Sequence, residues 1–322
     1  MPNVGSDYPP PAPFEHWYGL PKGDTICKLT AFSLSWLTLP EVWGIHPAGS
    51  DEKSNRHPVL ISLIRNEKTG KIALFDLGLA KDWESFLPPE QRPFYEMFDV
   101  DVEADADEAL AKVGVKGEDV DLLVISHKHF DHTGKPTLFP NAQIIVGPNE
   151  LPIASLEGHP CPVKELSWHA SPTHIAAFDH SYDVWGDGSF VVVSAPGHTE
   201  GHLAALVRTS PPRSDGTGGE YVLLAADCAH HPALLSLKPQ DAHYTLGRWR
   251  EKGEPLDQPP KHSNYEDHEL AAHTLERLKA CERREEVMVV LAHNFVQWER
   301  WGGRKGNWSI ELNEWKKRGL KG

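Results

Sequence analysis

A cluster of four side chains that can bind metal ions constrains this chain more than any other feature. His127, His129, Asp131 and His132 follow directly on residues 121–126 (DLLVIS), an apolar run typical of a buried strand. Because side chains alternate along an extended chain, His127 and His129 point the same way and can bind one ion together. Asp131 and His132 lie at the turn beyond, where they can reach a second ion. The pattern therefore predicts a metal site at the end of a strand.

Three further side chains of the same chemistry also stand at the ends of predicted strands. A strand is a rigid support, and the loop at its end can direct a side chain into a cleft. Imidazole and carboxylate ligands without a thiolate suit zinc, iron or manganese. The strands and the side chains that follow them are residues 190–195 before His198, residues 221–226 before Asp227, and residues 287–292 before His293.

Composition and charge exclude several classes of function. The 322 residues carry a net charge of −14, which argues against a nucleic-acid partner, because such partners are bound through Lys and Arg. No apolar run approaches the roughly 18 residues of a membrane span. Four widely spaced cysteines favour a reduced compartment, and the N-terminal residues lack the pattern of a signal peptide. We expect a cytoplasmic protein that acts on a small molecule.

The chain divides into a short arm and one large body. Residues 1–25 are rich in proline and are predicted to form an extended arm, which lies on the surface or exchanges between the subunits of a homodimer. Residues 26–322 are predicted to form a single layered α/β domain. Within it we expect strands at residues 26–37, 59–63, 72–75, 143–146 and 203–209, a mixed helical region at 82–113 with an acidic helix start at 99–108, an exposed loop at 210–219, and helices at 267–286 and 310–320.

The segment from Ser126 to Gly134 resembles the signature of the metallo-β-lactamase superfamily. Other landmarks of that superfamily occur in the expected order, and the resemblance covers about residues 26–300. They are Asp76 and Gly78 after a strand, the run from His198 to His202, Asp227 between Ala226 and Cys228, and His293 between Ala292 and Asn294. The resemblance implies an αββα sandwich, in which two mixed β-sheets face each other and helices lie on the outer faces.

The resemblance also implies a role for each candidate ligand around two divalent ions. We expect zinc, with iron or manganese as alternatives. The thiolate ligand of the antibiotic-degrading members is absent at position 227, so an antibiotic β-lactamase is disfavoured. The implied roles are His127, His129 and His198 on one ion, Asp131, His132 and His293 on the other, Asp227 as the bridge between them, and Asp76 as a support behind the ligand loops.

The predicted activity is hydrolysis by a hydroxide held between two metal ions, with Asp227 passing on its proton. Within the superfamily the sequence resembles the quorum-quenching lactonases and, more closely, fungal γ-lactamases that open the cyclic carbamate benzoxazolinone. His230 stands where those lactonases have a tyrosine, and a histidine can protonate a leaving nitrogen near neutral pH. We therefore predict a hydrolase that opens a small cyclic amide or carbamate. A lactonase acting on lactones such as acyl-homoserine lactones is the alternative.

Other functions of the same superfamily make different demands. A mono-iron dioxygenase uses one ion, and the complete second ligand set counts against it. A thioesterase remains an alternative. A nuclease requires a basic surface, of which the net charge of −14 gives little sign. Non-catalytic relatives usually lose ligands, and none is lost here.

Aromatic side chains are expected at the mouth of the site, where they can stack on a flat bicyclic substrate. Most tryptophans fill the core of a protein, so only some of these side chains are expected to touch substrate. The candidates, beside His230, are Trp36, Trp43, Tyr182, Trp185, Tyr244 and Trp249.

Overall fold

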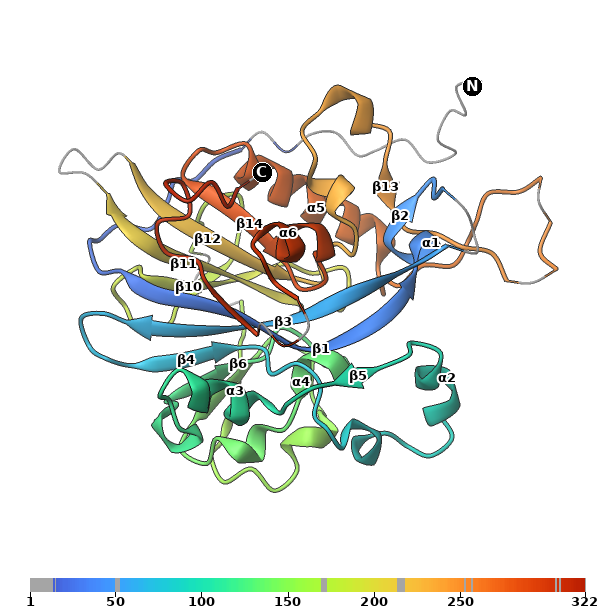
Figure 1. Cartoon of the computed structure of the whole chain (residues 1–322). Coiled ribbons are helices and arrows are strands. Elements are labelled where there is room, and N and C mark those ends of the chain that lie inside the picture. The colour runs from blue at the N-terminus through green and yellow to red at the C-terminus, as the bar shows by residue number, and fades with distance from the viewer. Residues whose placement is uncertain are drawn as a thin grey trace.

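Two β-sheets pack face to face in the computed structural model, and helices lie on their outer faces (Figure 1). The structure describes residues 14, 16–49, 53–168, 173–212, 218–251, 253–255, 257–304, 306 and 308–321. Both large sheets contain parallel and antiparallel neighbours. The αββα sandwich expected from the sequence is therefore confirmed.

The larger sheet joins the N-terminal strands to the motif at residues 127–132. Its strand order is β15-β1-β3-β4-β6-β7-β8, and β5 also pairs with β1. The neighbours from β15 to β4 are antiparallel, whereas those from β4 to β8 are parallel. In chain order the strands are β1 (Cys27–Pro40), β3 (Ser54–Asn66), β4 (Ile72–Phe75), β5 (Asp101–Val102), β6 (Leu122–Val124), β7 (Gln143–Val146), β8 (Val163–Glu165) and β15 (Ser309–Glu311).

The second sheet is built from the C-terminal half of the chain. Its order is β14-β12-β11-β10-β9, with β12 and β14 parallel and the other neighbours antiparallel. A separate pair joins β2 to β13. The bounds are β9 (Ser181–Asp183), β10 (Phe190–Ser194), β11 (Leu203–Pro212), β12 (Gly218–Ala226) and β14 (Val287–Leu291), with β2 (Ile45–His46) and β13 (Thr245–Leu246).

The helices are short, and the longest, α5, has 15 residues. Asp105 and Glu108 form a capping box at the start of α3, so the last part of the acidic stretch begins a helix as predicted, whereas Asp101 and Val102 earlier in the stretch form β5. No helix among the described residues is long and apolar enough to cross a bilayer. The helices are α1 (Glu41–Gly44), α2 (Arg92–Glu96), α3 (Ala106–Lys112), α4 (Phe130–Thr133), α5 (His268–Glu282) and α6 (Phe295–Arg300), and the 3-10 helices are η1 (Trp83–Phe86), η2 (Gly117–Asp119), η3 (Pro136–Leu138), η4 (Ala154–Leu156), η5 (Pro232–Leu235) and η6 (Pro239–Asp241).

Alternating side chains on the strands build the apolar layers of the sandwich. On β10, Val192 faces the core between the two sheets, whereas Val191 and Val193 belong to the cluster that includes buried residues of α5. On β3, Ile64 faces the central core, whereas Leu63 belongs to the cluster that includes α3. The two sheets are therefore held together by one continuous core, and each outer face is covered separately.

The helix predicted at residues 310–320 is wrong, because this segment adds a strand to the larger sheet. β15 pairs with β1, with Ile310 opposite Ala31. The side chain of Asn313 then accepts a hydrogen bond from the backbone N–H of Leu29 at 2.8 Å and donates to the carbonyl of Cys27 at 2.8 Å. These contacts with a distant strand outweigh the local helix preference of the segment.

Most of the predicted N-terminal arm lies outside the described residues, as does the centre of the predicted loop at 210–219. The described part, from residue 16 to residue 25, lies against the body of its own chain. The fully buried Arg208 on β11 holds it by donating hydrogen bonds to three carbonyl groups. The acceptors are Thr25 at 2.8 Å, Pro21 at 2.8 Å and Lys22 at 2.9 Å.

Replacement of Arg208 by alanine should therefore destabilise the protein. We expect the free energy of unfolding to fall by roughly 3 kcal/mol, because each buried carbonyl left without a donor costs about 1–3 kcal/mol and some will find water. Urea denaturation measures the change. The control is Arg283→Ala, at a side chain that is 42% exposed, where a change within about 0.5 kcal/mol is expected. Equal losses in the two variants would contradict the anchoring role.

Candidate metal centre

Seven candidate ligands from both sheets meet at one edge of the sandwich. His127 and His129 lie in the loop after β6, and Asp131 and His132 lie in α4, which follows it. The other three come from the second sheet. They are His198 after β10, Asp227 directly after β12, and His293 two residues after β14. The structure therefore brings together all seven side chains that the sequence analysis singled out as ligands.

The first group consists of three histidines and one aspartate. Nε2 of His127 and Nε2 of His198 each lie 2.9 Å from Nδ1 of His129. One carboxylate oxygen of Asp227, Oδ2, lies 3.5 Å from Nε2 of His198. One ligand atom from each of the four residues falls within 4.8 Å of the others, so the group could hold a metal ion.

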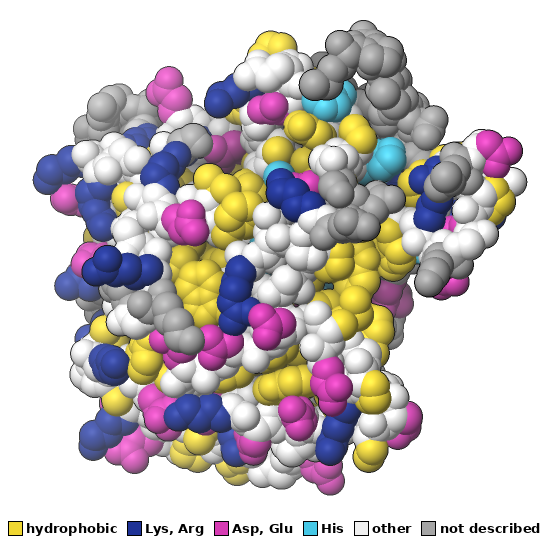
Figure 2. All heavy atoms as spheres, turned by 45° about the vertical axis from the view of Figure 1, so that its right-hand side comes forward, with side chains coloured by type: hydrophobic (Ala, Val, Ile, Leu, Met, Phe, Trp, Pro, Cys, Tyr) yellow, Lys and Arg dark blue, Asp and Glu magenta, His cyan; other side chains and the backbone are white. Residues whose placement is uncertain are grey.

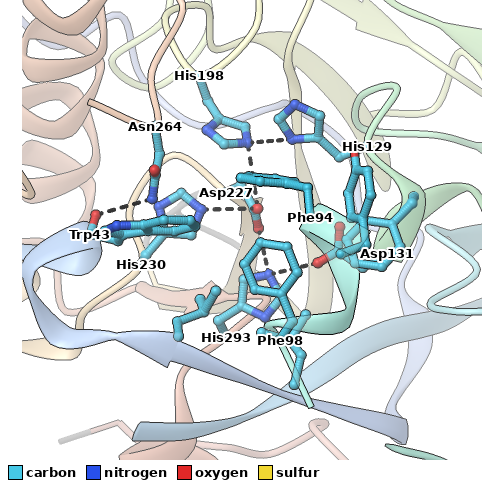
Figure 3. Close-up of a pocket in the computed structure, with 14 residues that line it drawn as sticks. Trp43, Phe94, Phe98, His129, Asp131, His198, Asp227, His230, Asn264 and His293 are labelled. Atoms are coloured by element: carbon cyan, nitrogen blue, oxygen red, sulfur yellow. Dashed lines mark hydrogen bonds and ion pairs between the residues drawn. The ribbon is translucent and has the colours of Figure 1, made fainter. Parts of the chain in front are cut away.

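The second group shares Asp227 but uses its other oxygen. Oδ1 of Asp227 lies 3.2 Å from Nε2 of His132 and 3.2 Å from Nε2 of His293. Oδ2 of Asp131 lies 3.3 Å from Nε2 of His293. These four ligand atoms also lie within 4.8 Å of one another. Asp227 thus stands between the two groups, with one oxygen toward each (Figure 3).

Two buried atoms of the second group have no hydrogen-bond partner, and this fits a metal site. They are Nε2 of His132 and Oδ1 of Asp227, which lie 3.2 Å apart without forming a hydrogen bond. Buried polar atoms in proteins are almost always hydrogen-bonded, so such atoms need an explanation. A cation bound between an imidazole nitrogen and a carboxylate oxygen would satisfy both, and the donor set is one that zinc, iron and manganese accept.

The pKa values of the candidate ligands are shifted in different directions. Burial lowers the pKa of His132, but the carboxylates of Asp227 and Asp131 outweigh it and hold the pKa well above its usual value. Burial and the neighbouring His132 hold the pKa of His127 well below its usual value, so this imidazole is neutral. Burial raises the pKa of Asp227, but His132 and His293 reverse that effect and the pKa lies well below its usual value. The bridging side chain is therefore a carboxylate, and the neutral imidazole is ready to bind metal.

Asp76 holds the ligand loop from behind. Its carboxylate accepts hydrogen bonds from the backbone N–H of Ser126 at 2.7 Å, from the Ser126 hydroxyl at 2.8 Å, and from Nδ1 of His132 at 2.9 Å. The last bond places the proton of His132 on Nδ1 and leaves Nε2 to face the centre. Asp76 has a φ of 62°, which a residue other than glycine rarely adopts, so its backbone is held in an unusual conformation that directs the side chain.

The ring of His293 is oriented in the same way. Its Nδ1 donates to the carbonyl of Pro58 at 3.0 Å, which leaves Nε2 for the centre. The buried His57 in turn donates from Nδ1 to the carbonyl of His293 at 2.8 Å. Burial lowers the pKa of His57 to about 3, so this ring acts as a neutral hydrogen-bond donor. β3 therefore supports a ligand that is carried by the opposite sheet.

An aromatic cavity opens above the two groups (Figure 3). Its volume of about 170 Å³ slightly exceeds that of an engineered protein cavity of about 150 Å³ that binds benzene, so a small ring compound fits. Figure 2 turns the side with α1 and α2 toward the viewer, and hydrophobic side chains gather on that face. The lining residues are Leu37, Leu39, Trp43, Phe94, Tyr95, Phe98, Phe130 and Asn264, together with His129, Asp131, His198, Asp227, His230 and His293.

Of the predicted pocket residues, Trp43 and His230 line this cavity, whereas Trp36, Tyr182 and Tyr244 lie outside its lining. Leu37 and Leu39 face the cavity. Because side chains alternate along a strand, Trp36, the residue before Leu37, points to the other side of β1, where its Nε1 donates to Glu103 at 3.1 Å. Tyr182 packs against the central core, as does Trp185, and Tyr244 packs against the outer cluster of the second sheet. Trp249 stacks on Trp43, with ring centroids 4.9 Å apart.

The sequence analysis missed most of the aromatic wall. Phe94, Tyr95 and Phe98 lie in and just after α2, in a region predicted only as mixed helical. Their spacing offered a weak signal, because residues three and four positions apart, such as Tyr95 and Phe98 or Phe94 and Phe98, share a helix face. Phe94 is 54% exposed, and its ring stacks on that of Trp43 at the mouth of the cavity, with centroids 6.4 Å apart.

Comparison with known proteins agrees with this geometry. Residues 55–205 match the family described as the metallo-beta-lactamase superfamily. The metallo-hydrolase mfmC of Annulohypoxylon moriforme is 30% identical over 258 residues, which are 69% of this chain and 66% of that protein. The gamma-lactamase MBL2 of Gibberella moniliformis is 36% identical over 187 residues, which are 49% of this chain and 70% of that protein. The chain spans between 30% and 66% of the length of three of its curated relatives.

A solved structure shares the fold over most of its length. It is an N-acyl homoserine lactone hydrolase with the product N-hexanoyl-L-homoserine bound at its catalytic metal center. The TM-score is 0.59 at 18% sequence identity, and the match covers 86% of this chain and 96% of that chain. At this level of identity the likeness shows the arrangement of the sheets.

Replacing Asp76 by alanine tests the support behind the ligands. Three buried donors would lose their acceptor, so we expect the free energy of unfolding to fall by roughly 2–4 kcal/mol. Chemical denaturation in the presence of a chelator measures this effect of the protein alone. Asp82→Ala is the control, because that side chain is 46% exposed and forms a surface ion pair worth about 0–1 kcal/mol. A loss at Asp76 no larger than at Asp82 would show that Asp76 is dispensable.

Proposed function

The chain belongs to the metallo-β-lactamase superfamily, and on this premise we propose that it is a metal-dependent hydrolase that opens small, neutral, cyclic amides or carbamates. The observation that carries the proposal is the sharing of Asp227 by two ligand groups at the floor of an aromatic cavity. The gamma-lactamase relative supports a lactam or carbamate substrate. The structural neighbour that hydrolyses an acyl-homoserine lactone keeps a lactone as the second candidate.

The first group would hold one divalent ion and the second group another, with Asp227 as their common ligand. Ions of this kind, zinc above all, lower the pKa of water to about 7 and polarise a carbonyl group. The complete second group favours two ions over the single iron of a dioxygenase. The buried histidines would bind these ions through Nε2 or Nδ1, which requires the supports behind them to remain in place.

His230 is placed to hold a proton at the leaving atom of the substrate. It lines the cavity, and its Nε2 lies 3.0 Å from Oδ2 of Asp227. A carboxylate can only accept, so the proton of His230 is on Nε2. Nδ1 then accepts from the hydroxyl of Tyr265 at 2.9 Å, and burial raises the pKa of that phenol well above its usual value, so it stays protonated. Hydrolysis adds the hydroxyl group of a water to the carbonyl carbon and the proton of the same water to the leaving nitrogen. Asp227 would accept this proton and pass it on, while the Nε2–H of His230 would donate a hydrogen bond to the leaving atom.

The walls of the cavity favour a neutral and flat substrate. Among the described residues that line it, none is a lysine or an arginine. A carboxylate or phosphate group held away from the metal-binding floor would lie against this wall without a cationic partner, which is costly. Trp43, Phe94 and Phe98 instead offer ring faces and edges, with Trp43 and Phe98 in an edge contact at 5.6 Å. This supports ring compounds over penicillin-like acids and over thioesters of anionic carriers.

A hydrolysis panel with zinc-loaded protein tests the substrate class. It contains benzoxazolinone, a neutral γ-lactam, the γ-lactone of the same ring size, an acyl-homoserine lactone, a penicillin and a glutathione thioester. We expect the neutral rings to be opened and the two anionic compounds to be poor substrates by at least tenfold in kcat/KM. A preference for the thioester would overturn the proposal, and activity on lactones alone would establish the second candidate.

Removal of metal should lower both activity and stability. A ligand present at about 100 times its Kd stabilises the native state by roughly 2.7 kcal/mol, so chelation should lower the Tm and added zinc should restore it. His129→Ala removes one ligand of the first group and should lose the ion of that group and most activity. His243→Ala is the matched control on an exposed histidine, and it should retain both. Full activity of the His129 variant would mean that the site is elsewhere.

His230→Ala distinguishes the two leaving groups. A nitrogen leaves less readily than an oxygen, so the loss of the proton donor should reduce kcat for a γ-lactam at least tenfold more than for the matched γ-lactone. Rates on both substrates at saturating concentration measure the difference. Equal losses on both would show that His230 has only a structural role.

A further inference from the structure

Glu150 is a fully buried carboxylate outside the ligand set, in the loop after β7. The function described above gives it no task. All three of its hydrogen bonds go to the two loops that carry the histidines of the first group. Oε2 accepts from the backbone N–H of Lys128 at 2.8 Å, and Lys128 lies between His127 and His129. The first loop is thereby fixed at its centre.

The other oxygen of Glu150 binds the loop of His198. Oε1 accepts from the hydroxyl of Thr199 at 2.6 Å and from the backbone N–H of Gly201 at 3.0 Å. Thr199 follows His198 directly, and its side chain is fully buried. One side chain therefore joins the loop after β6 in the larger sheet to the loop after β10 in the second sheet.

The backbone around this carboxylate is packed so closely that the connection has little freedom. A Cβ on Gly147 would lie 1.7 Å from the carbonyl oxygen of Gly201, and a Cβ on Gly201 would lie 2.0 Å from the carbonyl oxygen of Pro148. Such distances exclude any side chain at either position. The loop of Glu150 and the loop of His198 thus touch backbone to backbone, and the buried carboxylate fixes the third loop against them.

We propose that Glu150 is a positioning residue for the first metal-binding group, because it sets the distance between the His127–His129 loop and the His198 loop. The second group does not depend on it in the same way. Asp131 and His132 lie in α4, where His132 is held by Asp76, and His293 is held by Pro58. The inference rests on the proposed metal centre and is independent of the substrate.

The substitution Glu150→Gln tests this role with little change in shape. A glutamine has one carbonyl oxygen, so it can accept from Lys128 or from the His198 loop, and its NH2 group then faces a donor on the other side. Supporting residues behind metal ligands typically change metal affinity about tenfold to a hundredfold. We therefore expect a loss of that size in the zinc affinity of the first group alone.

The experiment measures zinc affinity by chelator competition in two single-site backgrounds. His293→Ala leaves the first group intact, and there the addition of E150Q should weaken zinc binding at least tenfold. His129→Ala leaves the second group intact, and there E150Q should change the affinity less than threefold. Equal losses in both backgrounds, or no loss in either, would overturn the proposal. Failure of the unsubstituted protein to bind zinc would overturn the metal centre itself.

Two further variants separate positioning from folding. Thr199→Val keeps the shape of the side chain but removes its hydrogen bond to Glu150, so it should weaken zinc binding in the His293→Ala background in the same direction and by a smaller factor. Glu282→Gln is the control, because Glu282 also accepts a backbone hydrogen bond, from Val289 at 3.0 Å, but it belongs to α5 and that bond goes to β14 rather than to a ligand loop. The zinc affinity of the Glu282→Gln variant should be unchanged. A Thr199 variant with unaltered affinity, or a Glu282 variant as impaired as E150Q, would count against the specific role.

Discussion

The buried carboxylate of Asp227 is the point on which the arrangement of both sheets depends. Nε2 atoms of five histidines lie between 3.0 and 3.9 Å from its two oxygens. A charge so thoroughly removed from water is tolerated only with close compensation. That compensation comes from loops of both sheets, so the sandwich must close at this edge for any of the contacts to form. The core between the sheets provides that closure.

The ligands of the larger sheet and those of the second sheet have separate supporting residues behind them. Asp76 and Ser126 serve the loop after β6, and Pro58 and His57 on β3 serve His293 of the opposite sheet. Asp76 and the carbonyl of Pro58 each fix a ring tautomer by occupying one nitrogen, which leaves the other for the centre. Glu150 contacts only backbone and hydroxyl donors of the loops and none of the rings. The geometry of the centre thus depends on two kinds of contact, those that orient individual imidazole rings and those that fix the loops carrying them.

The cavity above the centre has no lysine or arginine among its described lining residues, so its wall cannot neutralise an anionic group. An apolar, aromatic wall strengthens electrostatic effects at its floor because it excludes water. The same wall penalises any substrate that carries a charge of its own. On the side of the cavity lined by His230 and Asp227, the hydrogen bonds run in one direction. Tyr265 donates to His230, and His230 donates to Asp227. Under the proposed function, selection of a ring compound and protonation of its leaving atom would both take place in this one cavity.

The candidate metal ligands and the class of fold could be predicted from the amino-acid sequence alone. His127, His129, Asp131 and His132 are close in the chain, and each remaining candidate ligand follows a strand, so local pattern and resemblance were sufficient. The aromatic wall of the cavity could be seen only in the folded protein, because Trp43, Phe94 and Leu37 come from separate segments whose orientation depends on strand alternation and loop path. For the same reason Trp36 does not line the cavity. Residues 309–311 form a strand because they pair with β1, which lies far away in the sequence. Glu150 also escaped detection, since a buried carboxylate reveals its role only through the loops that it joins.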